Sequence, residues 1–167
     1  GVVAKLGPGV AKFREGDRVM AQLEHGAWAE SVVSPAATAY KIPDEMDFPT
    51  AATMGLTYQT AHFALVERGQ FRAGESVLVL GASRGVGLAA IELVKARGGR
   101  ALAGIPNMAK AALVRDAGAY VVVDLSAPDL RDSLRDQVFP ETDGRGADIV
   151  VDALGGTPFE GAIRALA

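Results

Sequence analysis

A glycine-rich segment, residues 81–87, restricts what this chain can fold into more than any other part of its sequence. It reads Gly-Ala-Ser-Arg-Gly-Val-Gly and follows an apolar run, residues 77–80, that is typical of a parallel strand buried on both faces. It also opens a segment, residues 85–97, whose apolar side chains recur at helical spacing. Small residues at a strand–turn–helix junction allow a sharp turn and a close approach of the backbone to a pyrophosphate. The segment therefore predicts a βα unit with a phosphate-binding loop.

Strands and helices are predicted to alternate throughout the rest of the chain. The expected strands are residues 77–80, 101–103, 120–123 and 148–151, and the expected helices are residues 85–97, 108–116, 128–137 and 159–166. This order indicates βαβ units with right-handed crossovers, and hence an α/β fold with a doubly wound parallel Rossmann sheet. A dinucleotide domain of this type normally has six strands. Because the pattern supplies only four, we expect the sheet to be partial.

The first fifty residues have a different sequence pattern. Short β-favouring pieces occur between turn signals, at residues 2–3, 18–21, 28–33 and 40–42. They predict part of an all-β module whose other strands lie outside this sequence. A helical stretch, about residues 50–68, leads into the α/β part. We therefore expect two domains, residues 1–50 and residues 51–167.

Charge and composition exclude several classes of function. Lys and Arg number 17 against 20 Asp and Glu, a net charge of −3, so binding of nucleic acid by bulk charge is not expected. No apolar run is long enough to span a bilayer, so no membrane partner is expected. Cysteine is absent, which excludes disulfides and thiolate zinc sites. Only His25 and His62 remain as imidazole ligands, and we predict no metal site.

The glycine-rich segment defines most of the candidate cofactor residues. Its backbone N–H groups, at the N-terminus of the following helix, are expected to hold a pyrophosphate. These candidates are Gly81, Ala82, Ser83, Arg84, Gly85, Val86 and Gly87.

The choice of dinucleotide depends on the second strand. An NAD site usually has an Asp or Glu near the end of this strand to bind the ribose 2′-hydroxyl. Here the segment around Gly104 contains no acid before Asp116. The absence of that carboxylate permits the 2′-phosphate of NADP, and Lys110 or Arg84 would pair with it. For each of these two residues, an ordinary solvated basic side chain is the alternative.

Further motifs follow one another in an order seen in a known family. They are residues 12–19 (KFREGDRV), 26–30 (GAWAE), 41–44 (KIPD), 60–61 (TA), 74–79 (GESVLV), 143–148 (DGRGAD) and 152–156 (DALGG). With the glycine-rich segment they resemble the medium-chain dehydrogenases/reductases, over essentially the whole chain. The match is most similar to the zinc-independent quinone oxidoreductase (zeta-crystallin-like) branch of the alcohol dehydrogenase superfamily, which includes enoyl-reductase relatives. Zinc-binding relatives insert a cysteine-rich lobe after the Gly-Asp-Arg-Val turn, where this chain has only residues 20–25.

The resemblance implies a function and several site residues. It implies that residues 1–50 belong to a GroES-like substrate domain. It also implies hydride transfer from NADPH to a small-molecule acceptor, either a quinone or an α,β-unsaturated carbonyl. Thr60 matches a threonine that positions the nicotinamide, with a hydroxyl bonded to the preceding helical turn as the alternative. Gly155, after the fourth strand, is a further cofactor residue, with a simple turn glycine as the alternative. A cytoplasmic homodimer is expected.

Two other interpretations remain open. Branch members usually have Gly where this chain has Arg84, and the loop also resembles the fingerprint of short-chain reductases, in which Arg is common. That family needs a Tyr-x-x-x-Lys pair, and none of the three tyrosines has a lysine four residues later. The second alternative is a catalytically weak relative that keeps the NADP-binding fold but acts as a structural or regulatory protein.

Overall fold

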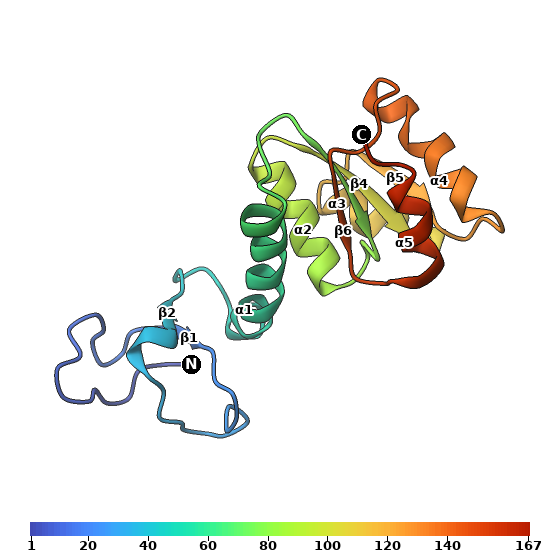
Figure 1. The fold of residues 1–167 in the computed structure, drawn as a ribbon. Helices are drawn as coiled ribbons and strands as arrows, with labels where there is room; N and C mark the ends of the chain where they lie inside the picture. The colour runs from blue at the N-terminus through green and yellow to red at the C-terminus, as the bar shows by residue number, and fades with distance from the viewer. The chain divides into compact units, whose positions relative to one another are not determined.

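The computed structural model describes residues 1–167, which form two compact units, residues 1–59 and residues 60–167 (Figure 1). The division between them falls inside one helix, α1 (Phe48–His62). The domain boundary expected after residue 50 remains a prediction. None of the helices combines the length and the apolar character needed to cross a membrane.

The second unit is built on a four-stranded parallel sheet with the strand order β5-β4-β3-β6. Its strands are β3 (Ser76–Leu80), β4 (Arg100–Ile105), β5 (Val121–Asp124) and β6 (Ile149–Asp152). The crossover helices are α2 (Gly85–Ala96), α3 (Ala111–Asp116) and α4 (Leu130–Val138), and a further helix, α5 (Gly156–Ile163), follows β6. This arrangement confirms the predicted doubly wound α/β sheet.

Several element boundaries differ from those expected. β4 is longer than residues 101–103, and α5 begins and ends three residues before the expected helix 159–166. The stretch 50–68 is α-helical only to His62 and continues as a π-helical segment, η2 (Phe63–Arg68). Short 3₁₀ turns add η1 (Ala36–Thr38), η3 (Met108–Lys110) and η4 (Pro140–Thr142).

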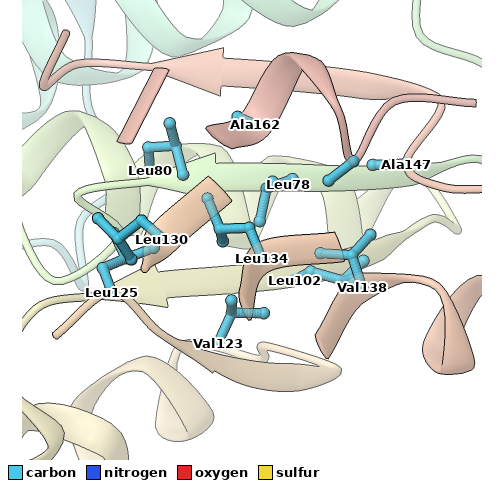
Figure 2. Packing of buried hydrophobic residues seen from close by; sticks show 11 residues of the cluster. Leu78, Leu80, Leu102, Val123, Leu125, Leu130, Leu134, Val138, Ala147 and Ala162 are labelled. Carbon is cyan, nitrogen blue, oxygen red and sulfur yellow. The ribbon is translucent and has the colours of Figure 1, made fainter. Parts of the chain in front are cut away.

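The sheet buries apolar side chains on both faces. All five residues of β3 are buried, as expected for a strand covered by helices on each side. One face, with Leu78 and Leu80, packs into a cluster with side chains of α4 and α5, as Figure 2 shows. Val77 and Val79 alternate to the opposite face, where α2 packs against β3 and β4. The sheet is thus a rigid support for the loops at its ends.

The first unit contains little regular structure. Its strands, β1 (Val19–Ala21) and β2 (Ala39–Lys41), pair antiparallel, and Val2 forms an isolated bridge to Arg18. The strand expected at residues 28–33 is wrong, because this segment forms bends and loop. Trp28 is fully exposed and Val33 is 95% exposed, since no neighbouring strand of this unit offers them a partner or a buried face. That this unit is part of a GroES-like domain stays a prediction.

Candidate dinucleotide site

The glycine-rich loop lies at the carboxyl edge of the sheet, between the end of β3 and the start of α2. Gly81 has a φ of +71°, which places it in the left-handed region that favours glycine. The Arg84 N–H donates to the Gly81 carbonyl at 3.2 Å, and the Ala82 N–H donates to the Gly104 carbonyl of β4 at 3.1 Å. The chain order of the strands reverses between β3 and β6. Open α/β sheets bind ligands at such a switch point.

Gly87 allows the first turn of α2 to pack directly onto this loop. A Cβ atom at residue 87 would lie 2.6 Å from both the Ala82 Cα and the Gly81 carbonyl oxygen. Both of these are backbone atoms, so no side-chain movement relieves the clash. Any residue other than glycine would push the helix away from the loop, and the helix N-terminus would move with it.

The N-terminus of α2 has the features of an anion site. Its N-cap residue, Arg84, makes no side-chain capping hydrogen bond, and its first turn contains no acidic residue. Arg84 and Gly85 are exposed, while Ser83 and Val86 are partly exposed. The first N–H groups of a helix have no intrahelical partner, and the helix dipole adds partial positive charge. The backbone N–H groups of residues 85–87 therefore fit a pyrophosphate.

A second loop, which follows β6, meets the glycine-rich loop. The Asp152 carboxylate accepts hydrogen bonds from the Leu154 N–H at 2.8 Å and from the Gly155 N–H at 3.0 Å. A Cβ atom at Gly81 would lie 2.9 Å from the Leu154 Cδ2. The structure thus brings the loop that contains Gly155 beside Gly81, two positions predicted from distant segments. Sequence reasoning assigned no role to Asp152 or Leu154, although an Asp before a glycine pair is a turn signal.

Gly104 is a packing position in the second strand. It is buried within β4, and a Cβ there would lie 3.2 Å from the Val79 carbonyl oxygen and from the Leu125 Cδ1. Beyond it, β4 ends at Ile105, and the Asn107 side chain caps the next turn by accepting the Ala109 N–H at 3.0 Å. The exposed Lys110 closes that turn. No residue between the end of β4 and Lys110 carries a carboxylate.

The neighbouring strand, β5, ends in an acid that sequence reasoning left without a role. Asp124 pairs in register with Ile105 of β4. Its Oδ1 accepts hydrogen bonds from the Ser126 N–H at 2.8 Å and the Ser126 Oγ–H at 2.7 Å. These two bonds lower the pKa of Asp124. The carboxylate is therefore charged at neutral pH.

Two further predictions from the sequence concern the role of Thr60 and the absence of metal ligands. Thr60 occupies an exposed position of α1, and its proximity to a nicotinamide remains a prediction. His62 Nε2 lies 3.2 Å from Arg97 Nη2, within hydrogen-bonding distance. No group of three or more His, Cys, Asp or Glu side chains is arranged to hold a metal ion.

Comparison with known proteins places this chain in a family. Residues 85–167 match the family described as zinc-binding dehydrogenase. The chain is 31% identical over 168 residues to a quinone oxidoreductase-like protein 2 homolog of Nematostella vectensis, covering 100% of this chain and 45% of that protein. The chain belongs to the medium-chain dehydrogenases/reductases, in their quinone oxidoreductase-like group. This confirms the resemblance drawn from the motifs.

Solved structures of this family share the fold. A crystal structure described as an NAD-dependent alcohol dehydrogenase matches with a TM-score of 0.89 and 34% identity, over 100% of this chain and 55% of that chain. A mycobacterial protein solved in complex with NADPH matches with a TM-score of 0.85 and 34% identity, over 100% of this chain and 52% of that chain. The chain thus spans about half the length of its medium-chain relatives. A nicotinamide dinucleotide is the cofactor class that they support.

Proposed function

We propose that this chain is the cofactor-binding part of an NADPH-dependent oxidoreductase that transfers hydride to a quinone or an α,β-unsaturated carbonyl. The observation that carries the proposal is the uncapped N-terminus of α2, seated on the loop of residues 81–84 at the switch point of the sheet. The family resemblance supports the acceptor class, and the quinone oxidoreductase-like name of a relative agrees with it. A cytoplasmic homodimer is part of the same proposal.

Preference for NADPH over NADH rests on the charges near the end of β4. No carboxylate follows Ile105 before the exposed Lys110, so no side chain of this turn is built to accept hydrogen bonds from a ribose 2′-hydroxyl. Lys110 supplies one positive charge there, and the exposed Arg84 at the N-cap of α2 supplies another. Lys110 on this turn and Arg84 at the N-cap of α2, with no acid between Ile105 and Lys110, favour a 2′-phosphate.

The bound nicotinamide would supply the hydride chemistry, and the chain's own residues would bind and orient it. The N–H groups of residues 85–87 would hold the pyrophosphate, with Gly81 and Gly87 keeping the loop and helix close together. Asp152 would fix the loop of Gly155 beside the glycine-rich loop through its two backbone hydrogen bonds. The role assigned to Thr60 is positioning, not proton transfer.

Fluorescence titration with NADPH and NADH tests the cofactor assignment. The parent protein is expected to bind NADPH more tightly, and Lys110→Ala to lose about tenfold in NADPH affinity, because a charge-assisted contact is lost. NADH affinity should change little. Arg115→Ala is the matched control, since it removes one positive charge at the other end of α3, where the helix ends. Equal affinity of the parent for both dinucleotides would overturn the preference.

NADPH oxidation with a panel of quinones and enones tests the activity. Consumption with at least one acceptor class is expected. Tight NADPH binding without consumption of any acceptor would contradict the oxidoreductase function and support a structural or regulatory protein that keeps the cofactor fold.

A further inference from the structure

The position of Asp124 relative to the glycine-rich loop follows from the strand register. Leu80 of β3, Gly104 of β4 and Val123 of β5 lie in one row across the sheet. One residue further toward the carboxyl edge, Asp124 pairs with Ile105, and the Ala82 N–H bond to the Gly104 carbonyl continues the ladder on the side of β3. Gly81 and Asp124 therefore lie level with each other, on either side of β4.

The separation of these two residues matches one half of a dinucleotide. Adjacent strands are about 4.8 Å apart, so two spacings place Asp124 about 10 Å across the sheet edge from the phosphate loop. An adenosine group extends over a comparable length from its phosphate to the exocyclic amino group of the base. A pyrophosphate held at the N-terminus of α2 would thus allow the adenine to reach the end of β5.

The side chain of Asp124 points to the appropriate face of the sheet. Val123 and Leu125, its two neighbours, are buried in the cluster that packs against α4 and α5. Side chains alternate along a strand, so Asp124 lies on the opposite face, the one covered by α2 and α3. This is also the face on which the N-terminus of α2 offers its free N–H groups.

One set of hydrogen bonds holds the Asp124 carboxylate in place, and a second set holds its backbone. Ser126 donates its N–H and its Oγ–H to Oδ1. The Gln137 side chain of α4 accepts the Asp124 N–H at 2.7 Å and donates to the Asp124 carbonyl at 3.1 Å. The side chain is half-buried, and these bonds leave Oδ2 available as an acceptor. The Asp124 carboxylate is therefore a fixed group that can only accept hydrogen bonds, at the edge of the proposed site.

We infer that Asp124 is a specificity-determining residue that accepts a hydrogen bond from the exocyclic amino group of adenine. The inference rests on the proposed dinucleotide function and adds a residue that recognises the adenine base. An ionised carboxylate can only accept, and the adenine amino group donates at that position. Hypoxanthine has a carbonyl oxygen there, which would face the carboxylate without a proton between them. The residue therefore selects adenine dinucleotides over their deaminated counterparts.

The test compares affinities for NADPH and for reduced nicotinamide hypoxanthine dinucleotide phosphate, measured by fluorescence titration. Both ligands carry the same phosphates, so repulsion between Asp124 and a 2′-phosphate, or attraction by Lys110, cancels in the ratio. The parent protein should bind NADPH at least about tenfold more tightly than the hypoxanthine analogue, as a hydrogen bond to a charged group is lost. Asp124→Asn should reduce the ratio to near one, because an amide can either accept or donate.

Control variants separate recognition from folding. The Asn side chain in Asp124→Asn keeps an oxygen for the Ser126 donors, so the melting temperature should stay close to that of the parent. Asp129→Asn removes a neighbouring exposed carboxylate that makes no side-chain capping bond at the start of α4, and it should leave the ratio unchanged. Ser126→Ala loosens the carboxylate and should give an intermediate ratio.

The possible failures are distinguishable. If the parent binds neither dinucleotide, the proposed function is overturned and this inference with it. If the parent binds NADPH and the hypoxanthine analogue equally, the cofactor function stands and the role of Asp124 is overturned. A ratio that survives Asp124→Asn unchanged overturns it as well.

Discussion

In the unit of residues 60–167 the central strand β3 has five residues, all of them buried, whereas β1 and β2 in the unit of residues 1–59 have three residues each. The first unit buries only four hydrophobic residues, Phe13, Ala39, Ile42 and Ala51. A two-stranded pairing of this size does not bury enough apolar surface to be stable alone. The two units must therefore be ordered by different interactions.

In the first unit, hydrogen bonds and ion pairs of Arg18, Lys12 and Lys41, which we call polar clamps, take the place of packed apolar layers. The Arg18 guanidinium donates to the backbone carbonyls of Pro43, Asp44 and Met46, which fixes the segment before α1 to β1. Lys12 Nζ donates to the Ala39 carbonyl at 3.0 Å, and Lys41 pairs with Asp17 at 2.7 Å. Each of these bonds is directional and partly solvated, so its net contribution is modest. A substitution of the same type, such as Val→Asp, should thus lower the stability of the second unit much more than that of the first.

The largest expected effect is that of Val79→Asp. Val79 is completely buried in β3, between β4 and β6, so the carboxylate would have no hydrogen-bond partner or counter-ion in the sheet. The cost of several kcal/mol is comparable with the whole stability of a domain, and we expect loss of the folded α/β unit. Circular dichroism and thermal melting will measure it. Val33→Asp, at a 95% exposed position of the first unit, is the control and should leave the melting temperature within a few degrees. A folded Val79→Asp protein would contradict the assignment of β3 as the central support.

Gly85→Val should separate binding from folding within the α/β unit. Residue 85 is exposed at the first turn of α2, so the new side chain meets little of the protein itself. It would occupy the space into which the backbone N–H groups point, and we expect NADPH affinity to fall at least about a hundredfold, by loss of several charge-assisted contacts. The melting temperature should change by only a few degrees. Gly7→Val, where an added Cβ meets nothing within 4 Å, controls for the substitution itself. Normal NADPH affinity in Gly85→Val would remove the basis of the proposed function.

The sequence predicted the α/β unit better than the first unit for a physical reason. Continuous burial leaves a strong pattern, as in residues 77–80, and each strand–helix alternation repeats it. Residues 28–33 also contain apolar residues, yet they form no strand, because a strand requires a partner and a core that this unit does not supply. Local pattern therefore predicts a strand only where the tertiary environment is present.

The candidate site was only partly predictable for a similar reason. Gly81 and Gly87 were identified because the loop motif is contiguous in sequence. The contact of Leu154 with Gly81 joins two loops more than seventy positions apart in the chain, and the place of Asp124 beside the site depends on the register of β4 with β5. Neither relation leaves a signal in one stretch of sequence. Both needed the strand order, which fixes the neighbours of each loop.

The pH dependence of stability offers a finer comparison. Burial alone would raise the pKa of Asp148, but the hydrogen bonds from the Ser76 N–H and Oγ–H, at 2.7 and 2.8 Å, with help from Arg145, lower it below the ordinary value. A lowered folded-state pKa means that this stabilisation is complete above the unfolded pKa, about 4, and is lost as the pH falls through the folded value. Asp148→Ala should lose about 1–3 kcal/mol at pH 7, because Ser76 is fully buried and loses its acceptor.

The difference between parent and Asp148→Ala should shrink as the pH is lowered below about 4, and urea unfolding at several pH values will measure it. Asp148→Asn keeps an acceptor for Ser76, so it should lose less and show a weaker pH dependence. Lys41 and the Arg14 N–H also lower the pKa of Asp17 in the first unit, but both of these partner residues are exposed, whereas Ser76 is buried, so Asp17→Ala should have a smaller effect. If the difference in unfolding free energy between the parent and Asp148→Ala did not change with pH, the hydrogen bonds to Ser76 would act without the carboxylate charge.

The smallest expected effect is that of removing metal. The matching family is described as zinc-binding, and a structural zinc ion is one way to stabilise a unit with few buried residues, such as residues 1–59. This chain has no cysteine, and its two histidines lie in different units, His25 in the first and His62 beside Arg97 in the second. We therefore expect elemental analysis to find less than one zinc per chain, and a chelator to leave the melting temperature and the NADPH affinity unchanged. Stoichiometric zinc, or a chelator-dependent loss of structure in the first unit, would mean that a metal and not the clamps of Arg18, Lys12 and Lys41 orders that unit. If zinc orders the first unit, the Arg18→Ala variant should be as stable as the parent when zinc is present. If the clamps order it, as we propose, Arg18→Ala should destabilise the first unit with or without zinc.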